Sequence, residues 1–168
     1  MSDAEPNARR SARTLLVDQD DRILLLRFRF DADDDSAGYG WCTPGGGLRD
    51  GEPPLDAAVR ELFEETGVAA DPETLVGPVA LISGYADLGW TAGWFRDDFY
   101  FHRAAATAID TSRMEDLESS YHAGHRWWTV SELESTTEWV APLGLAGLLR
   151  DLLDGRVPDE PVRLPWHH

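Results

Sequence analysis

Three glutamates at helical spacing are the residues of this chain with the clearest capacity for chemistry. Glu61, Glu64 and Glu65 stand at i, i+3 and i+4 of a segment whose apolar residues recur at helical intervals. At roughly 100° per residue, their carboxylates share one face of the expected helix. Like charges on one face repel, and a hard divalent cation would remove the conflict. Because neither Cys nor His accompanies them, the residue types indicate Mg²⁺ or Mn²⁺ rather than zinc.

The residues before these glutamates complete a longer pattern, G-x5-E-x7-R-E-U-x-E-E-x-G-U, where U is bulky and apolar. Its first three fixed positions are Gly46, Glu52 and Arg60. Arg60 can pair with Glu64 one turn on, or with Glu52. Glycines 45–47 can adopt backbone angles closed to other residues and let the backbone approach a ligand. The alternative, a solvated acidic helix face, is disfavoured because all fixed positions occur together.

The stretch from Gly46 to Val68 resembles the Nudix box, with every defining position present. Nudix proteins are mostly Mg²⁺-dependent hydrolases of nucleoside diphosphate derivatives, such as nucleotide sugars, nucleoside triphosphates and dinucleotides. The resemblance therefore implies hydrolysis of a diphosphate linkage by water that a metal activates. It also implies a nucleotide-type small molecule as the partner.

The resemblance gives roles to individual residues. Those expected to act in catalysis are Glu61, Glu64, Glu65, Glu52 and Arg60. The three helix glutamates are also the expected metal ligands, together with Gly45 of the glycine loop. Gly46 and Gly47 are expected to contact substrate. Which glutamate is the general base stays open.

Further candidates lie outside the box. Glu118 is the first choice for an additional metal-binding carboxylate, with Glu115 and Asp116 as alternatives. A solvated acidic loop explains these residues equally well. Arg27 and Arg29 are candidates to grip phosphate, because Arg can bind it bidentately. Arg27 is preferred, and an ordinary surface pair is the alternative.

The aromatic residues of the segment 85–95 have two interpretations. Trp90, Trp94 and Phe95 can stack on a base or another flat group, or they can serve as core or dimer contacts. Cys42 is the single cysteine and lies in an apolar, strand-like patch, so we expect it to pack rather than to act as a nucleophile. It excludes an intrachain disulfide and fits a reducing cytoplasm.

Length and charge limit the remaining possibilities. At 168 residues the chain is expected to form one domain, with no apolar run long enough for a membrane span. The polar N-terminus has no secretory h-region, so we expect a cytoplasmic protein. The net charge of −16 would repel nucleic-acid backbones and anionic membranes, and also a nucleotide substrate unless basic groups or metal offset it.

Strand-like runs alternating with two main helical segments predict an α/β fold. The resemblance implies the Nudix fold, a mixed sheet sandwiched between helices. We expect a flexible leader over residues 1–13, the Nudix domain over 14–155 and a tail over 156–168. A DNA-binding domain is not expected, and a homodimer is an open option.

Two other functions stay as alternatives. A non-catalytic Nudix-like nucleotide sensor would lack box carboxylates or carry a fused DNA-binding domain, and neither is expected here. An isoprenoid diphosphate isomerase would need a catalytic cysteine, for which Cys42 is only loosely placed.

Overall fold

The computed structural model of the chain describes residues 7–105 and 108–167. Its strands are β1 (Arg9–Val17), β2 (Ile23–Arg29), β3 (Tyr39–Cys42), β4 (Gly45–Gly47), β5 (Val76–Asp87), β6 (Ala92–Arg103), β7 (His122–Trp128), β8 (Trp139–Val140) and β9 (Val162–Arg163). Its α-helices are α1 (Pro54–Thr66), α2 (Asp116–Tyr121), α3 (Val130–Ser135) and α4 (Leu145–Leu153), with 3₁₀ turns at Asp35–Ala37 and Pro72–Thr74. Within these ranges the helices are all too short or too polar to cross a membrane.

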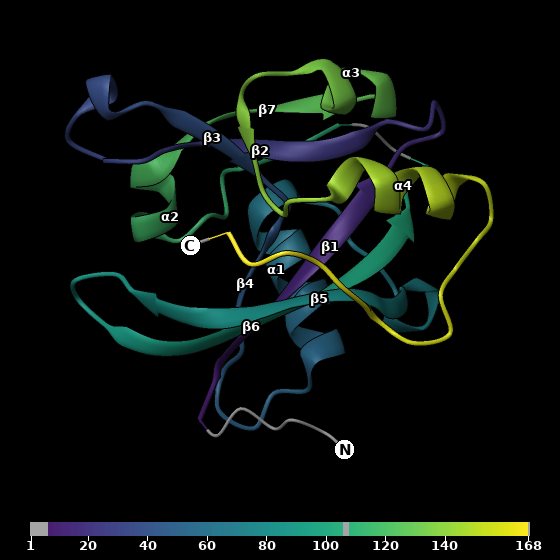
Figure 1. Cartoon of the computed structure of the whole chain (residues 1–168), viewed down its shortest axis with the longest axis horizontal. Coiled ribbons are helices and arrows are strands. Elements are labelled where there is room, and N and C mark those ends of the chain that lie inside the picture. The colour runs from purple at the N-terminus through teal and green to yellow at the C-terminus, as the bar shows by residue number, and fades with distance from the viewer. Residues whose placement is uncertain (1–6, 106–107, 168) are drawn as a thin grey trace.

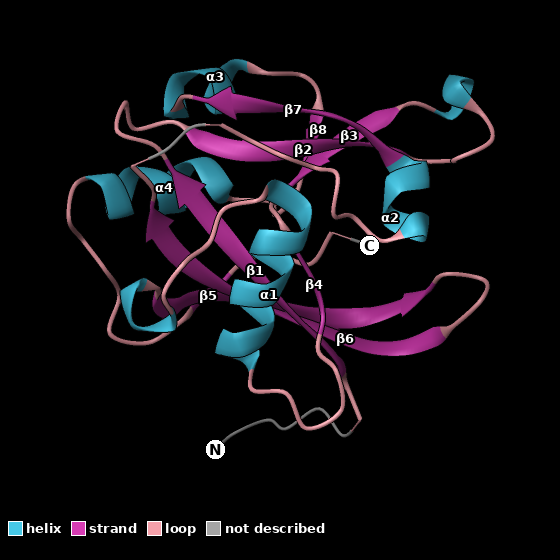
Figure 2. Cartoon of the chain, turned by 180° about the vertical axis from the view of Figure 1, so that it is seen from behind, coloured by secondary structure: helices cyan, strands magenta, loops and turns pink. Residues whose placement is uncertain are grey.

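The strands form one mixed sheet in the order β8-β3-β2-β1-β6-β5-β9, with β4 on β1 and β7 on β2. β1 runs parallel to β6 from Arg9↔Phe95 to Val17↔Arg103. It meets β2 only at Val17↔Ile23, so the two halves of the sheet diverge from that point, as Figure 1 shows. Figure 2 shows α1 in front of β1 and β4, while α4 lies on the opposite side. The predicted α/β fold with a mixed sheet between helices is confirmed.

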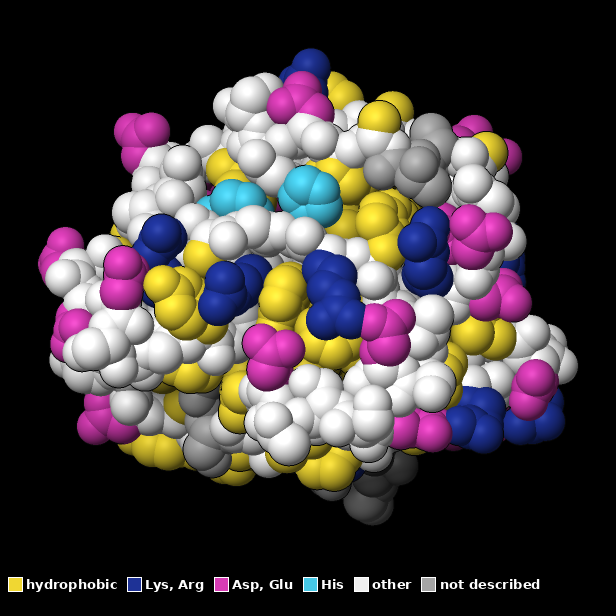
Figure 3. All heavy atoms as spheres, turned by 90° about the horizontal axis from the view of Figure 1, so that it is seen from above, with side chains coloured by type: hydrophobic (Ala, Val, Ile, Leu, Met, Phe, Trp, Pro, Cys, Tyr) yellow, Lys and Arg dark blue, Asp and Glu magenta, His cyan; other side chains and the backbone are white. Residues whose placement is uncertain are grey.

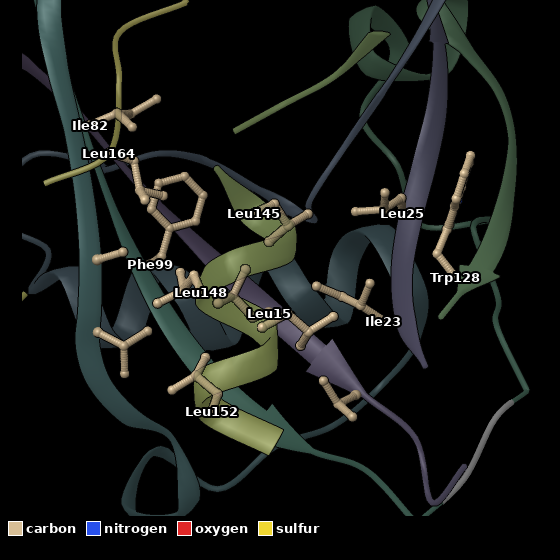
Figure 4. Packing of buried hydrophobic residues seen from close by; sticks show 14 of the residues in the cluster. Leu15, Ile23, Leu25, Ile82, Phe99, Trp128, Leu145, Leu148, Leu152 and Leu164 are labelled. Atoms are coloured by element: carbon tan, nitrogen blue, oxygen red, sulfur yellow. The ribbon is translucent and has the colours of Figure 1, made fainter. Parts of the chain in front are cut away.

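Side chains of β1 alternate between the two faces of the sheet, so this strand packs against both layers of helices. Leu15 and Val17 pack with the leucines of α4, whereas Ala12 belongs to the cluster beneath α1. Successive side chains of a strand point to opposite faces, so an apolar run such as this one is buried on both sides. Figure 4 shows Leu15 beside Leu148 of α4 in the larger cluster. β1 is therefore the central strand on which the site is built.

Helix α1 begins after Pro53 and ends where the Gly67 N–H donates to the Phe63 carbonyl at 2.9 Å, with Gly67 in the left-handed conformation. Although the apolar residues of α1 recur at helical intervals, not all of them face the core. Phe63 is 38% exposed, and the Arg113 guanidinium lies 4.7 Å from its ring centroid. Glu61 is buried although it is charged, because strand β4 packs against the side of the helix that carries Glu61.

Both chain ends contribute to the sheet. β1 begins at Arg9, inside the segment expected as a leader, because residues 9–13 pair with β6 and with β4. Residues 1–6 of that segment lie outside the described residues. In the expected tail, Val162 and Arg163 form β9 beside β5, and Leu164 is buried in the core. The division into leader, domain and tail stays a prediction.

Two segments between α1 and α3 form a hairpin and a short helix. The aromatic stretch 85–95 lies in a long hairpin of β5 and β6. The segment 104–124 contains α2, which the sequence did not indicate, and residues 106–107 of this segment fall outside the described ranges. The helix has six residues, too few for a periodic apolar pattern, and is capped by a Glu115–Glu118 capping box.

Candidate active site

The glycine strand β4 brings the loop before α1 into contact with two glutamates of that helix. Gly45 has φ +154°, a conformation that L side chains rarely adopt, and its N–H donates to Glu65 Oε2 at 2.7 Å. A Cβ at Gly46 would lie 2.7 Å from the carboxyl carbon of Glu61. The absence of a side chain at Gly46 therefore leaves room for the Glu61 carboxylate, while the backbone of Gly45 holds the Glu65 carboxylate.

Three carboxylates converge beside this strand. Glu61 and Glu65 of α1 and Glu118 of α2 each offer an oxygen within 4.8 Å of the others. Glu61 and Glu65 are 5% and 6% exposed. The buried Oε2 of Glu61 has no hydrogen-bond partner among the residues that the structure describes. We refer to Glu61, Glu65 and Glu118 as the acidic trio.

The environment of the trio opposes negative charge. Burial raises the pKa of Glu65 to about 8, although the Gly45 hydrogen bond works in the other direction. Burial also raises the pKa values of Glu61 and Glu118, and neighbouring carboxylates add to the increase. Grouped oxygens that are hard to ionise alone, one of them unsatisfied, fit a hard divalent cation such as Mg²⁺.

Arg60 links the glycine loop to the helix. Its Nε and Nη2 donate to the two oxygens of Glu52 at 2.9 and 2.8 Å, and Nη1 donates to Glu61 Oε1 at 2.8 Å. Nη2 also donates to the Gly47 carbonyl at 3.1 Å. The Arg60 hydrogen bonds lower the pKa of Glu52 to about 2. Both partners foreseen for Arg60 are present, since its Nη1 also reaches Glu64 Oε2 at 3.3 Å.

Glu64 differs from the expectation of three helix glutamates on one metal-binding face. Its second oxygen lies 3.5 Å from Arg49 Nη2, and its side chain is 21% exposed. It is not a member of the trio, where Glu118 from α2 stands instead. On the helix, the i and i+4 glutamates point into the site while the i+3 glutamate lies toward the arginines. Its expected metal role stays a prediction.

A cavity of about 710 Å³ adjoins the trio, because Glu65 and Glu118 line it. The lining residues from the glycine strand and the box helix are Gly45, Gly46, Gly47 and Glu65, and the others include Arg9, Arg13, Arg27, Trp90, Met114, Leu117, Glu118, Tyr121 and His122. Its walls are thus the start of β1, the middle of β2, the hairpin tip and α2. We call it the metal-side cavity.

The two candidate phosphate-binding arginines are placed differently. Arg27 lines the metal-side cavity, with its guanidinium 4.0 Å from the Tyr39 ring centroid. Its Nε is buried without a partner in the described part of the chain. Arg29 instead donates to Asp35 at 3.0 Å and to the His122 carbonyl at 2.7 Å. The preference for Arg27 therefore agrees with the geometry, while substrate contact stays a prediction.

The aromatic candidates of the hairpin also separate. Trp90 is 70% exposed at the tip and lines the metal-side cavity, where the Arg9 guanidinium lies 5.1 Å from its ring. Trp94 contacts Tyr85 edge-on at 6.2 Å and is 44% exposed. Phe95 lies one residue further along β6. Of the three, Trp90 is the best placed to meet a ligand.

Cys42 separates the metal-side cavity from a neighbouring cavity of about 510 Å³, because it lines both. Burial raises the pKa of its thiol to about 11, so the thiol is protonated near neutral pH. A protonated thiol is a poor nucleophile. This fits the expectation that Cys42 packs rather than reacts.

Sequence reasoning missed Arg9 and Arg13, which line the metal-side cavity from β1. Both were assigned to the leader. Extending the strand alternation backward from Leu15 would have placed Arg9, Ser11 and Arg13 on one face. Elsewhere on the surface, Figure 3 shows arginine and acidic side chains interspersed on the face seen from above, so the net charge is not gathered there.

The NUDIX domain family model matches residues 7–147. The chain is 30% identical over 118 residues to diphosphoinositol polyphosphate phosphohydrolase 2 of Mus musculus, covering 68% of this chain and 54% of that protein. It is 44% identical over 62 residues to an RNA pyrophosphohydrolase of Novosphingobium aromaticivorans, covering 37% and 36%. The chain thus spans about half or less of these relatives. Its fold is similar to the NUDIX domain of Shewanella oneidensis NrtR, solved with ADP ribose (TM-score 0.63, 16% identity, 91% and 93% covered).

Proposed function

The chain belongs to the NUDIX family, and on that premise we propose that it is a Mg²⁺-dependent pyrophosphohydrolase of nucleoside diphosphate derivatives. The observation that carries the proposal is the acidic trio, in which the buried Oε2 of Glu61 has no partner among the described residues. A divalent cation held by these oxygens would neutralise the diphosphate and lower the pKa of water. Mn²⁺ has the same ligand preference and is the expected substitute.

The proposal assigns a separate role to each group of site residues. Glu61, Glu65 and Glu118 would hold the cation, and the Gly45 N–H fixes the rotamer of Glu65. Glu52 is a positioning residue, because both of its oxygens are held by Arg60 and its pKa of about 2 makes it a weak base. Arg60 in turn orients Glu61. Arg27, which lines the same cavity, would supply a cation for phosphate oxygens.

The competing functions have less support. The box carboxylates of an active enzyme are complete, which argues against a sensor without catalysis. The isomerase alternative needs a reactive cysteine, and Cys42 is held as a thiol by burial. A nucleotide-type substrate also fits the NUDIX relative that was solved with ADP ribose, although the shared fold alone does not carry its ligand over.

The decisive experiment is a hydrolysis panel with and without Mg²⁺. We would incubate the protein with ADP-ribose, nucleoside triphosphates, NADH, dinucleoside polyphosphates and 5′-triphosphorylated RNA, and follow release of phosphate or nucleoside monophosphate. Glu61→Gln and Glu65→Gln should lower kcat/KM on the order of 100-fold or more, because each removes a charge from the metal clamp. Asp56→Asn, on the exposed first turn of the same helix, is the matched control. Absence of turnover on the whole panel, or full turnover in both Gln variants, contradicts the proposal.

A further inference from the structure

The second cavity, of about 510 Å³, lies between the two diverging halves of the sheet. Its aromatic lining residues are Phe28, Phe30, Phe99, Trp139 and His167. Phe28, Phe30 and Trp139 contact one another edge-on, with ring centroids 5.5 to 5.9 Å apart. We call this cavity the aromatic pocket. Such a lining favours a flat, uncharged ring.

One carboxylate stands in this apolar surrounding. Asp97 of β6 lines the aromatic pocket, and its Oδ2 accepts from Arg13 Nε at 2.8 Å. Arg13 Nη1 donates to the Thr43 carbonyl at 2.9 Å, so the arginine is held from two sides. The Asp97 side chain is 16% exposed. The hydrogen bonds of the described residues leave its other oxygen, Oδ1, without a donor, and that oxygen is not fully buried.

An acceptor oxygen in an apolar pocket discriminates between ligands. A ring that brings an N–H or amino group satisfies Oδ1, while a ring that brings only acceptors leaves the carboxylate desolvated and opposed by a second lone pair. Arg13 already satisfies the other oxygen, Oδ2, through its Nε, and its Nη1 donates to the Thr43 carbonyl. An anionic group is disfavoured for the same reason. The aromatic pocket therefore suits the ring of a ligand and not its phosphates.

The aromatic pocket and the metal-side cavity adjoin. Arg13, Phe28 and Cys42 line both of them. A single ligand can thus place its diphosphate over the acidic trio and its ring beside Asp97. The arrangement connects the carboxylate to the specificity of the same site rather than to a separate one.

We propose that Asp97, oriented by Arg13, is a specificity-determining residue that selects substrates whose ring presents an N–H or amino donor at this edge. The inference rests on the proposed function for the identity of the phosphate-bearing substrate. It goes beyond that function by naming the edge chemistry of the ring and the residue that reads it.

The wild-type protein tests the inference without any variant. Isothermal titration calorimetry with Mg²⁺ would compare two ligand pairs that differ by one amino group: AMP with purine riboside 5′-monophosphate, and GMP with IMP. We expect the amino-bearing member of at least one pair to bind about tenfold more tightly, as for a hydrogen bond to a charged acceptor. Equal affinities within both pairs, or no measurable binding of any of the four, overturn the inference.

Asp97→Asn reverses the chemistry at the same position. The amide keeps an acceptor oxygen for Arg13 and replaces Oδ1 with a donor, so the preference within the pair should vanish or invert. Asp87→Asn, at the exposed end of β5, should retain the wild-type preference. A folded Asp97→Asn protein with the wild-type preference overturns the inference. If that variant does not fold, the wild-type comparison decides alone.

Hydrolysis separates this inference from the proposed function. The nucleoside triphosphates of the same four rings would be assayed for kcat/KM. Turnover without discrimination in either assay leaves the proposed function standing and removes the role of Asp97. Discrimination in binding without turnover of any substrate removes the proposed function and leaves the role of Asp97.

Discussion

The backbone N–H of Gly45 donates to Glu65 Oε2 at 2.7 Å, across 20 positions of sequence. This bond joins the strand before the box helix to a carboxylate near the end of that helix. Glu65 is 6% exposed, so the bond is formed in surroundings of low polarity, where charge-assisted hydrogen bonds are strong. It does not outweigh the cost of burial, because the pKa of Glu65 still rises to about 8.

The raised pKa of Glu65 predicts a pH-dependent stability of the metal-free protein. Between its ordinary value of 4.5 and about 8, the folded state binds a proton that the unfolded state releases. The contribution of Glu65 to the free energy of unfolding is therefore full below pH 4.5 and is lost as pH rises toward 8, by a few kcal/mol. Urea denaturation in EDTA from pH 5 to 8.5 measures the slope.

Glu65→Gln supplies the control for that slope. The amide oxygen can still accept from Gly45 but does not titrate, so the variant should lose much of the decrease in stability. Mg²⁺ should stabilise the wild-type protein more at pH 8 than at pH 6, because it binds the ionised carboxylate. A wild-type slope that is unchanged in Glu65→Gln would show that the carboxylate does not titrate as its burial implies.

The contact between Gly46 and Glu61 predicts unequal effects for neighbouring glycines. A methyl group at Gly46 would lie 2.7 Å from the Glu61 carboxyl carbon, whereas the nearest neighbour of one at Gly47 is the Arg10 carbonyl oxygen at 4.0 Å. Gly46→Ala should displace Glu61 and weaken Mn²⁺ binding about tenfold, a loss typical of disturbed metal support. Gly47→Ala should bind Mn²⁺ as the wild type does. Electron paramagnetic resonance titration of free Mn²⁺ measures both, and equal affinities in the two variants would contradict the prediction.

The box region could be predicted closely from sequence, because its constraints are local. Helical spacing placed Glu61 and Glu65 on one side of α1, and Arg60 met both expected partners. The separation of Glu64 from the trio could not be foreseen, since it depends on where β4 packs against the helix. Spacing alone predicts equivalent positions for the three glutamates, whereas in the structure Glu61 and Glu65 are buried and Glu64 is not.

Long-range convergence was harder to predict. Glu118 was preferred among three acidic residues, yet its approach to Glu61 depends on α2, a helix too short to leave a periodic signal. Arg13 and Asp97 are 84 positions apart and meet only because β1 runs parallel to β6. Parallel pairing between distant strands has no turn to mark it in the sequence. The aromatic pocket was missed for this reason.

The Arg60–Glu52 pair predicts a coupling energy that depends on pH. Arg60→Lys keeps the charge but loses the two-pronged geometry, and Glu52→Gln loses the charge. A double-mutant cycle at pH 7 should give a coupling of about 1–3 kcal/mol. Because the folded pKa of Glu52 is lowered to about 2, this stabilisation is present above pH 4.5 and declines as pH falls toward 2.

Thermal unfolding at pH 7 and pH 3.5 would measure that coupling. The coupling should be smaller at pH 3.5, where the unfolded state already holds the proton. Arg49→Lys serves as the comparison with Arg60→Lys, because Arg49 is a more exposed arginine of the same region. Its Nη2 lies 3.5 Å from Glu64, and its side chain is 62% exposed. A coupling that does not change with pH would mean that the pair acts through packing rather than through charge.

Capping boxes on α2 and α3 allow the metal role of Glu118 to be separated from its helix-capping role. Glu118 occupies the third position of α2 and Glu132 that of α3, and each accepts from the backbone N–H of its N-cap residue. Only Glu118 belongs to the acidic trio. Replacement by Gln preserves an acceptor for the cap but removes the charge. Glu118→Gln should therefore weaken Mn²⁺ binding about tenfold with little loss of stability, whereas Glu132→Gln should leave Mn²⁺ affinity unchanged.

Calorimetric titration with Mn²⁺, together with thermal unfolding of both variants, tests the separate roles of Glu118. Wild-type Mn²⁺ affinity in Glu118→Gln would assign Glu118 to capping alone and reduce the metal site to the two glutamates of α1.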